Sequence, residues 1–414
     1  MNLPSIRQLA FSAVIFALLL SLTACTQSAV SKDPIRIGVI TSLTGTNAAF
    51  GQAHKTGYTI AVNDINAAGG INGRKLEMVY FDDQSKPDRA VQGVSRLVDQ
   101  EHVPLILGAY SSESTYAMVP VVTQKQVPLI IPTAVADNIM AAGSPWVFRV
   151  CAGSGVFATA TLDFLKNNGD PKNIAIIYEN TNYGQANRKS MLQAAQQRGI
   201  NVVADEAYQA KSPDYLELLR RVKERNPDAI YFASYLLDAS ALMRQAKQVS
   251  LNVKYFTSAG TGFSAPEFPT DGGAGDQAEY TFSVSQWLPS VQWKGSKEFD
   301  TKYFHLLGAH PAYHGMEAYA AAMTAKEAIE KAGSLDPTAL RDALRRVDMP
   351  ETPFGPIKFD GRGQNAHPVL ITQVLRKEGK LDYRVVWPRE GAETQAVIPT
   401  PPWNERKETT AQRQ

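Results

Sequence analysis

Short apolar runs alternate with amphipathic stretches along the chain from residue 34 onward. The runs at 35–40 and 76–81 are brief and almost uninterrupted, which is typical of strands that are buried on both faces. Between and after these runs, apolar side chains recur at helical spacing over 58–65 and 91–98. Strand and helix in this order predict an α/β fold, in which helices cover both faces of a parallel sheet.

The same alternation returns after residue 150. Strands are predicted at 174–178, 202–203, 229–232 and 255–256, and helices at 185–198, 215–222 and 239–249. No residue-level repeat relates the two blocks, so the pattern predicts two similar lobes rather than a solenoid. Beyond Tyr280, a strand and two helices near 295–307 and 313–331 are predicted to return to the first lobe. The polar tail from residue 389 is rich in Pro and Thr and is predicted to be disordered.

Composition and charge narrow the class of protein. Hydrophobic residues make up 44% of 414 residues, and such a chain is longer than one hydrophobic core usually holds, so two domains are expected. The net charge of +2 and the lack of basic runs argue against a nucleic-acid partner.

Residues 1–24 have the features of a targeting segment. Arg7 is followed by an apolar stretch at 9–22 that is shorter than a membrane-spanning helix. The segment ends in Leu22-Thr23-Ala24-Cys25, which resembles the lipobox of bacterial lipoproteins, in which the cysteine is acylated and becomes the new N-terminus. The alternative is an ordinary secretory signal. With lipid on Cys25, Cys151 is the one cysteine left, which excludes an intramolecular disulfide and a zinc site made of cysteines.

A cluster of serines follows the apolar run 103–107. Gly108 ends the run, and Ser111, Ser112 and Ser114 come just before an apolar helix. Backbone N–H groups at a helix start suit a carboxylate or another small anion, although plain helix capping by serine is the alternative interpretation. A second apolar run, 127–131, leads into small residues at 133–136. Two neighbouring parallel strands would bring both loops to one crevice at the carboxyl edge of the sheet.

Several motifs in combination resemble the leucine/isoleucine/valine-binding protein family, the type I periplasmic substrate-binding proteins of ABC transporters. The resemblance covers nearly all of residues 34–388 and rests on segments 40–45, 50–51, 66–74, 82–87, 108–115, 146–149, 182–184 and 354–360. It implies two Rossmann-like lobes joined by three crossings, with the ligand between them. The first lobe would comprise 34–150 plus 281–365 and the second 151–280 plus 366–388, followed by the tail 389–414.

The resemblance also implies a set of ligand-binding residues. Ser112, beside Ser111, and the Ala134 backbone would hold a ligand carboxylate on the first lobe. Phe50 and Tyr110 would wall the pocket, with core packing as the alternative for each aromatic residue. Tyr183, expected in a loop, and Tyr235 would close over the ligand from the second lobe.

Two positions depart from the family pattern. Ala259 stands where amino-acid-binding members place an acidic residue that pairs with the ligand ammonium, so either Glu113 or Asp238 replaces it or the ligand has no amine. Val135 stands where Thr is usual, and Thr133 is a candidate to supply the lost hydroxyl. These changes favour an apolar or aromatic acid, an amide or a modified amino acid over plain leucine. Trp287 is a further candidate for a flat pocket wall.

Other groups of polar residues give weaker indications of a function. His310, His314 and Glu317 have metal-like spacing, but Pro311 interrupts any shared helix face, so surface or interface positions are expected and no metal site is predicted. Asp238 is expected to cap the helix 239–249. No Gly-x-Ser-x-Gly elbow and no phosphate-binding glycine loop after the first strand is present, so neither an enzyme nor a cofactor is predicted.

The sequence therefore predicts a lipid-anchored solute-binding protein in the periplasm or at the cell surface. It is expected to act as a monomer and to deliver a small amino acid, amide or aromatic acid to ABC permease and ATPase subunits. The alternative is a ligand-sensing receptor or regulator domain of the same fold.

Overall fold

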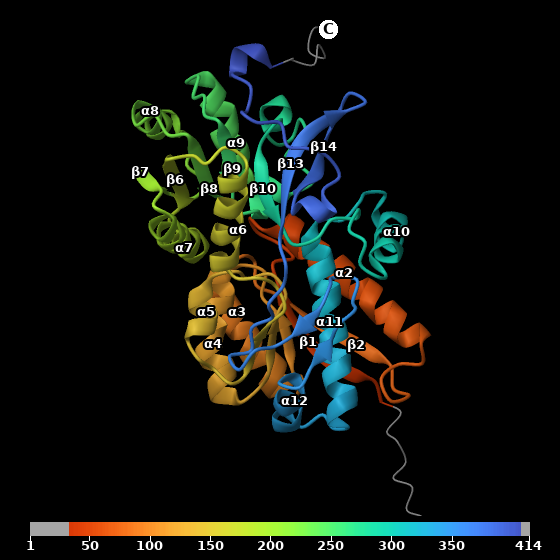
Figure 1. Cartoon of the computed structure of the whole chain (residues 1–414). Helices are drawn as coiled ribbons and strands as arrows, with labels where there is room; N and C mark the ends of the chain where they lie inside the picture. The colour runs from red at the N-terminus through yellow and green to blue at the C-terminus, as the bar shows by residue number, and fades with distance from the viewer. Residues whose placement is uncertain (1–32, 407–414) are drawn as a thin grey trace, which may run out of the picture.

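The computed structural model describes residues 33–406, which form two α/β lobes stacked one above the other (Figure 1). The predicted targeting segment, Cys25 and the last residues of the tail, 407–414, lie outside the described residues. Between residues 33 and 406, no helix combines the length and apolarity needed to cross a bilayer.

The first lobe is built on a five-stranded parallel sheet with the strand order β2-β1-β3-β4-β5. Its strands are β1 (Ile35–Thr41), β2 (Leu76–Asp82), β3 (Ile106–Gly108), β4 (Leu129–Ile131) and β5 (Val147–Arg149). Its helices are α2 (Ala48–Ala67), α3 (Pro87–Ser95), α4 (Ser112–Lys125), α5 (Asp137–Ala141), α10 (Ser296–Leu307), α11 (Tyr313–Ala332) and α12 (Pro337–Leu344).

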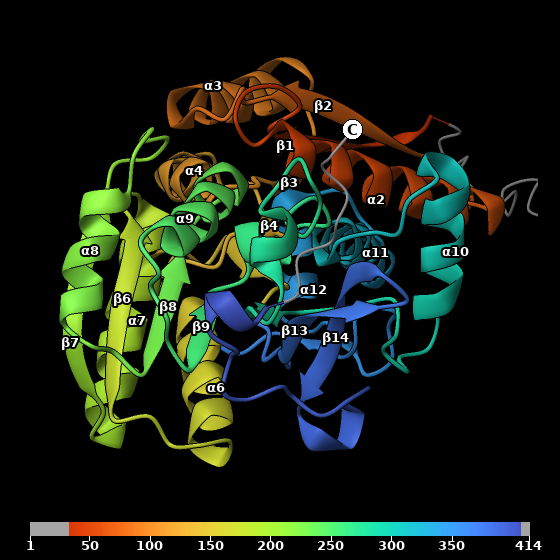
Figure 2. The ribbon, with the colours of Figure 1, turned by 90° about the horizontal axis from the view of Figure 1, so that it is seen from above.

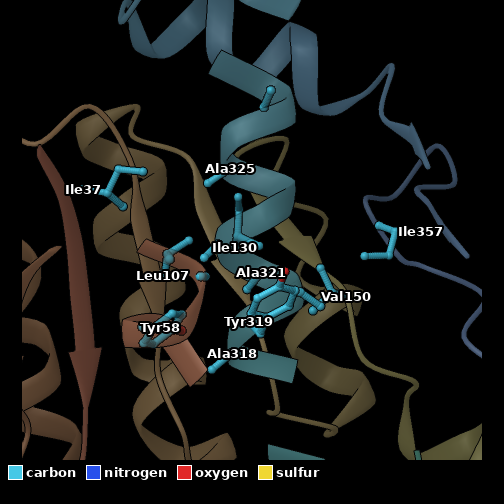
Figure 3. Packing of buried hydrophobic residues seen from close by; sticks show 14 of the residues in the cluster. Ile37, Tyr58, Leu107, Ile130, Val150, Ala318, Tyr319, Ala321, Ala325 and Ile357 are labelled. Carbon is cyan, nitrogen blue, oxygen red and sulfur yellow. The ribbon is translucent and has the colours of Figure 1, made fainter. Parts of the chain in front are cut away.

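Successive side chains of the first sheet enter two separate cores, because a strand points alternate residues to opposite faces. Ile37 and Leu107 pack with α2, α11 and α12, whereas Ile40 and Ile106 pack with α3 and α4. Figure 3 shows part of the first of these cores, in which Ala318, Ala321 and Ala325 of α11 pack in one cluster with Tyr58 of α2 and with Ile37 and Leu107 of the strands.

Helices α2 and α11 approach each other closely. A Cβ atom added at Gly57 of α2 would lie 1.9 Å from the carbonyl oxygen of Gly315 in α11, so only glycine fits there. Because α11 begins near residue 313, this contact draws the start of α11 towards the cleft side of the lobe.

The second lobe repeats the design with a four-stranded parallel sheet of order β7-β6-β8-β9. Its strands are β6 (Asn173–Glu179), β7 (Asn201–Tyr208), β8 (Ala229–Ala233) and β9 (Tyr255–Ser258). Helices α6 (Ser154–Asn167) and α7 (Asn182–Arg198) cover one face, and α8 (Leu216–Glu224) and α9 (Leu236–Gln248) cover the other (Figure 2).

A third sheet extends the second lobe. It has the order β10-β13-β14, formed by β10 (Phe282–Ser285), β13 (Leu370–Lys377) and β14 (Lys380–Trp387). Phe282 and Val284 belong to the core of the second lobe, so the chain returns to the first lobe after Ser285 rather than at the predicted residue 281. A small β-ribbon of β11 (Asp348–Met349) and β12 (Ile357–Lys358) completes the first lobe.

Three chain segments cross between the lobes, and Gln286 connects all of them. Its Oε1 accepts a hydrogen bond from the Ala152 N–H (2.6 Å) in the first crossing, and its carbonyl accepts one from His367 Nε2 (2.8 Å) in the third. Its Nε2 donates to Glu317 Oε1 of α11 (2.6 Å). The hinge is therefore one hydrogen-bonded unit rather than three separate strands.

The C-terminal segment packs on the second lobe and corrects the predicted disorder as far as residue 406. Trp403 is only 8% exposed, its ring lies 5.6 Å from that of Phe256, and its Nε1 donates to the Leu251 carbonyl (2.7 Å). The Arg406 guanidinium stacks over the same indole at 3.6 Å. One buried aromatic residue thus orders a segment whose composition suggests none.

Candidate functional site

A small cavity lies between the lobes at the carboxyl ends of β3 and β4, the edge at which open α/β sheets bind ligands. It is lined by Tyr110, Ser112, Thr133, Val135, Tyr183, Tyr235, Thr261 and His314. Six of these were predicted from the sequence, so the structure brings most of the predicted set together. Their contact with a ligand stays a prediction.

Two of the predicted serines have different roles at the start of α4. The Ser111 hydroxyl accepts a hydrogen bond from the Ser114 N–H (3.1 Å), which makes Ser111 a helix N-cap. Ser112 is buried, lines the cavity and accepts a weak hydrogen bond from the Ala136 N–H (3.3 Å). The capping interpretation therefore holds for Ser111, whereas Ser112 faces the cavity at the positive end of α4.

The loop after β4 is held from behind by a buried arginine. The Arg149 guanidinium donates to the carbonyls of Ala134 (3.2 Å) and Ala136 (3.0 Å) and pairs with Asp137 (3.0 Å). Arg149 also donates to Gln364 (2.6 Å), beside the third crossing. Thus the Ala134 carbonyl faces Arg149, and it is the neighbouring Thr133 and Val135 that line the cavity.

The Thr133 hydroxyl already has a hydrogen-bond partner within the protein. It donates a hydrogen bond to the Tyr110 carbonyl (3.0 Å), which ties the loop after β4 to the loop after β3. The sequence predicted that this hydroxyl replaces the one missing at Val135. To donate to a ligand, the Thr133 hydroxyl would have to give up its hydrogen bond to the Tyr110 carbonyl.

Aromatic rings from both lobes pack against one another around the cavity. Phe50 and Tyr110 of the first lobe stack with centroids 4.7 Å apart and an interplanar angle of 6°. Tyr183 and Tyr235 of the second lobe lie 5.0 Å apart, and Tyr235 lies 6.3 Å from Tyr110. Phe50 supports Tyr110 without lining the cavity. Trp287 is fully buried in the first-lobe core, which corrects its proposed place in the pocket wall.

Glu113 joins the two lobes across the cleft. Its carboxylate accepts hydrogen bonds from the Tyr183 N–H (3.0 Å) and the Tyr235 hydroxyl (3.4 Å). Tyr183 lies in the first turn of α7, not in the predicted loop, and its hydroxyl donates to the Ala259 carbonyl (3.3 Å). Ala259 therefore stands behind the tyrosine, and Thr261 lines the cavity in its place. The Glu113 carboxylate thus holds the two lobes in contact across the cleft.

Two further carboxyl groups, those of Glu179 and Asp238, lie beside this contact and line a separate pocket. Burial, with the charges of Asp238 and Glu113, raises the pKa of Glu179 from 4.5 to about 8. Asp238 accepts hydrogen bonds from the Lys211 N–H (3.1 Å) and the Tyr215 hydroxyl (2.8 Å), and burial raises its pKa. Helix α9 begins at Leu236, so Asp238 sits in its first turn and is not the predicted N-cap.

Sequence reasoning missed His314, Thr261 and Glu179. His314 is 2% exposed and lines the cavity, so the expectation of a surface position was wrong for it, and likewise for the fully buried Glu317. No cluster of metal-ligating side chains occurs among residues 33–406. Glu179 follows an apolar strand run directly, the same signal that singled out the serine cluster, and could have been found by it.

Comparison with known proteins identifies the family. A family model described as periplasmic binding protein matches residues 34–380. The chain belongs to this family. This match confirms the predicted resemblance and the predicted fold of two Rossmann-like lobes. The relatives in this family are binding proteins rather than enzymes.

Two curated periplasmic binding protein relatives cover most of the chain. The leucine-, isoleucine-, valine-, threonine- and alanine-binding protein of Pseudomonas aeruginosa is 29% identical over 338 residues, covering 80% of this chain and 87% of its own. The Leu/Ile/Val-binding protein homolog 3 of Brucella melitensis is 28% identical, covering 89% and 96%.

Solved structures share the fold. The leucine-binding protein LivK of Thermotoga maritima superposes with a TM-score of 0.78 at 26% identity, covering 86% of this chain and 99% of that one. A Rhodopseudomonas palustris solute-binding protein in complex with 3,4-dihydroxybenzoic acid gives 0.77 at 21% identity, with 89% and 99% covered. The second likeness concerns the fold alone.

Proposed function

We propose that the protein is the extracytoplasmic solute-binding subunit of an ABC importer and that it binds a small carboxylate or amide ligand between its lobes. The observation that carries this proposal is the cavity lined by Ser112 on one lobe and by Tyr183 and Tyr235 on the other. The start of a helix favours an anionic group, and aromatic rings provide apolar contact for the remainder of the ligand. The periplasmic binding protein family supports the same role.

Hinge closure is the proposed mechanism. The ligand docks on the first lobe, and the tyrosines of the second lobe reach it only when the lobes close. Because the ligand contacts both lobes in the closed form, its binding shifts the population from open to closed. The permease then distinguishes the closed from the open form, and no covalent bond is made or broken.

The chemistry around the cavity favours a ligand without an amine. Ala259 offers no carboxylate, Asp238 is bonded within the second lobe, and Glu113 is engaged by the two tyrosines. An ammonium buried without an anion is unfavourable. An aromatic or apolar acid, or an amide, therefore fits better than leucine. Leucine, isoleucine and valine appear in the names of both curated relatives and are the comparison that any test must include.

A thermal-shift screen of the soluble form that begins after Cys25 tests this proposal, because a ligand that binds only the folded state raises its melting temperature. Amino acids, amides and aromatic acids form the panel. Ser112→Ala should weaken binding of a responsive carboxylate by roughly 10-fold or more, the value of a hydrogen bond to a charged group. Ser290→Ala, an exposed serine after β10, is the control. A Ser112→Ala variant that binds the carboxylate as tightly as the parent protein would contradict the proposed role of Ser112.

Membrane attachment through lipid on Cys25 is the second part of the proposal. The protein would act as a monomer beside the permease and ATPase, in the periplasm or at the cell surface. Cys25→Ser should move the protein from the membrane fraction to the soluble fraction. If both forms fractionate with membranes, the lipid is not the anchor.

A further inference from the structure

The wall of the cavity on the first lobe contains polar atoms that have no partner. Tyr110 and His314 line the cavity and are 4% and 2% exposed, and Tyr110 Oη and His314 Nδ1 are buried and form no hydrogen bond with any described residue. Their rings are 5.5 Å apart. A buried polar group without a partner costs about 1–3 kcal/mol, so an arrangement of this kind calls for an explanation.

More polar atoms of the same kind lie directly behind these two. His54 Nε2 on α2 and Glu317 Oε2 on α11 are also buried and unpartnered among the described residues. The His54 ring lies 5.5 Å from Tyr110, and Glu317 is close enough that its ionised form would raise the pKa of the Tyr110 hydroxyl. Four buried polar groups without partners therefore lie close together on the first lobe, and two of the residues that carry them, Tyr110 and His314, line the cavity.

Burial favours the neutral form of His54, His314 and Glu317. Burial lowers the pKa of His54 to about 3 and that of His314 well below 6.5, and it raises the pKa of Glu317 well above 4.5. A neutral imidazole carries one N–H donor and one acceptor nitrogen, and a phenol both donates and accepts. Such a surface matches a group that is itself neutral and can do both, such as a hydroxyl or an amide. A charged group would lose its hydration without gaining an opposite charge.

We propose that His314 and Tyr110, backed by His54 and Glu317, form a polar subsite that hydrogen-bonds a neutral hydroxyl or amide at the end of the ligand away from its carboxylate. This inference rests on the proposed function, because it takes the ligand carboxylate to lie at Ser112. Phe50 stacks on Tyr110 and lies 4.9 Å from the His314 ring, so the subsite sits beside an apolar wall. The ligand class is thus a small acid with a distal polar group.

The first test needs no ligand. Tyr110→Phe and His314→Phe remove the unpartnered polar atoms and keep aromatic rings. If the polar atoms serve a ligand, ligand-free Tyr110→Phe and His314→Phe should melt at the same temperature as the parent protein or higher, because a buried unsatisfied group is removed. A clear fall in melting temperature for both variants would show a structural role and overturn the proposal.

The second test uses matched pairs of probes. Benzoate and 4-hydroxybenzoate, and phenylalanine and tyrosine, differ by one added hydroxyl, whereas in valine and threonine a hydroxyl replaces a methyl group. The parent protein should bind the hydroxylated member of a pair at least 10-fold more tightly, and both variants should lose most of that preference. An unchanged preference in the variants, or a parent protein that favours the apolar member, overturns the subsite. If none of the six probes binds, the proposed ligand class fails, and the subsite is decided by the melting temperatures.

Discussion

Glu179 makes the stability of the protein depend on pH in a direction that can be stated beforehand. Its carboxyl group is 3% exposed, and its pKa is raised from 4.5 to about 8. Below pH 4.5 the group is protonated in the folded and the unfolded state alike. Between pH 4.5 and 8 only the unfolded state releases the proton, so the free energy of unfolding falls as the pH rises. Each pKa unit is worth 1.36 kcal/mol, which gives a loss of roughly 5 kcal/mol at most.

Glu179→Gln isolates this contribution. The amide is neutral at every pH and can still accept the hydrogen bond from the Tyr235 N–H (3.5 Å). Melting temperatures from pH 4.5 to 9 should coincide for parent and variant at the acidic end and diverge by several degrees at the alkaline end, with the variant more stable. Glu224→Gln, an exposed change on α8, is the control and should follow the parent protein. Parallel curves for parent and Glu179→Gln would refute the argument.

Three further predictions concern closure, the hinge and the C-terminal segment. Glu113→Gln should weaken the charge-assisted bonds to the second lobe by about 1–2 kcal/mol, which small-angle scattering would detect as a larger radius of gyration; an unchanged radius would argue against Glu113 as a clasp. Gln286→Ala leaves the Ala152 N–H of the first crossing and the Glu317 carboxyl group of α11 without the partner that the Gln286 side chain provides, so the free energy of unfolding should fall by about 2–4 kcal/mol in denaturant titrations, whereas exposed Gln292→Ala should not change it. Trp403→Ala should lower the melting temperature of the second lobe, at a cost of about 3 kcal/mol, and leave ligand affinity intact; calorimetry that shows no change would count against the packing role.

The layered fold was predictable because the strands are buried on both faces. Apolar runs such as 35–40 can only be central strands when helices cover each side, and β1 spans Ile35–Thr41 as the run suggests. The family motifs then supplied the two-lobe arrangement that alternation alone leaves open. The site was predictable to the same degree: parallel strands had to bring the loops after β3 and β4 to one edge.

What local patterns missed depends on contacts between distant residues. The sequence predicted Asp238 to be a helix cap. Its carboxylate oxygens instead accept hydrogen bonds from Lys211 and Tyr215, which lie 27 and 23 residues earlier in the chain. His314 looked like a surface residue because Pro311 interrupts the local pattern. It is buried because α11 packs against α2 along most of its length, an event that sequence spacing does not reveal.

Because the hydrogen-bonded hinge lies apart from the cavity, ligand affinity and ligand choice depend on different residues. The affinity of a closing protein is the intrinsic fit of its ligand reduced by the free energy needed to reach the closed form. Gln286 joins the crossings without lining the cavity, and Arg149 ties the ligand loop to the third crossing. Under the proposed function, substitutions around these two residues would change the solute concentration at which the lobes close, while the choice of solute stays with the cavity. The affinity for the solute can therefore change through residues that do not line the cavity.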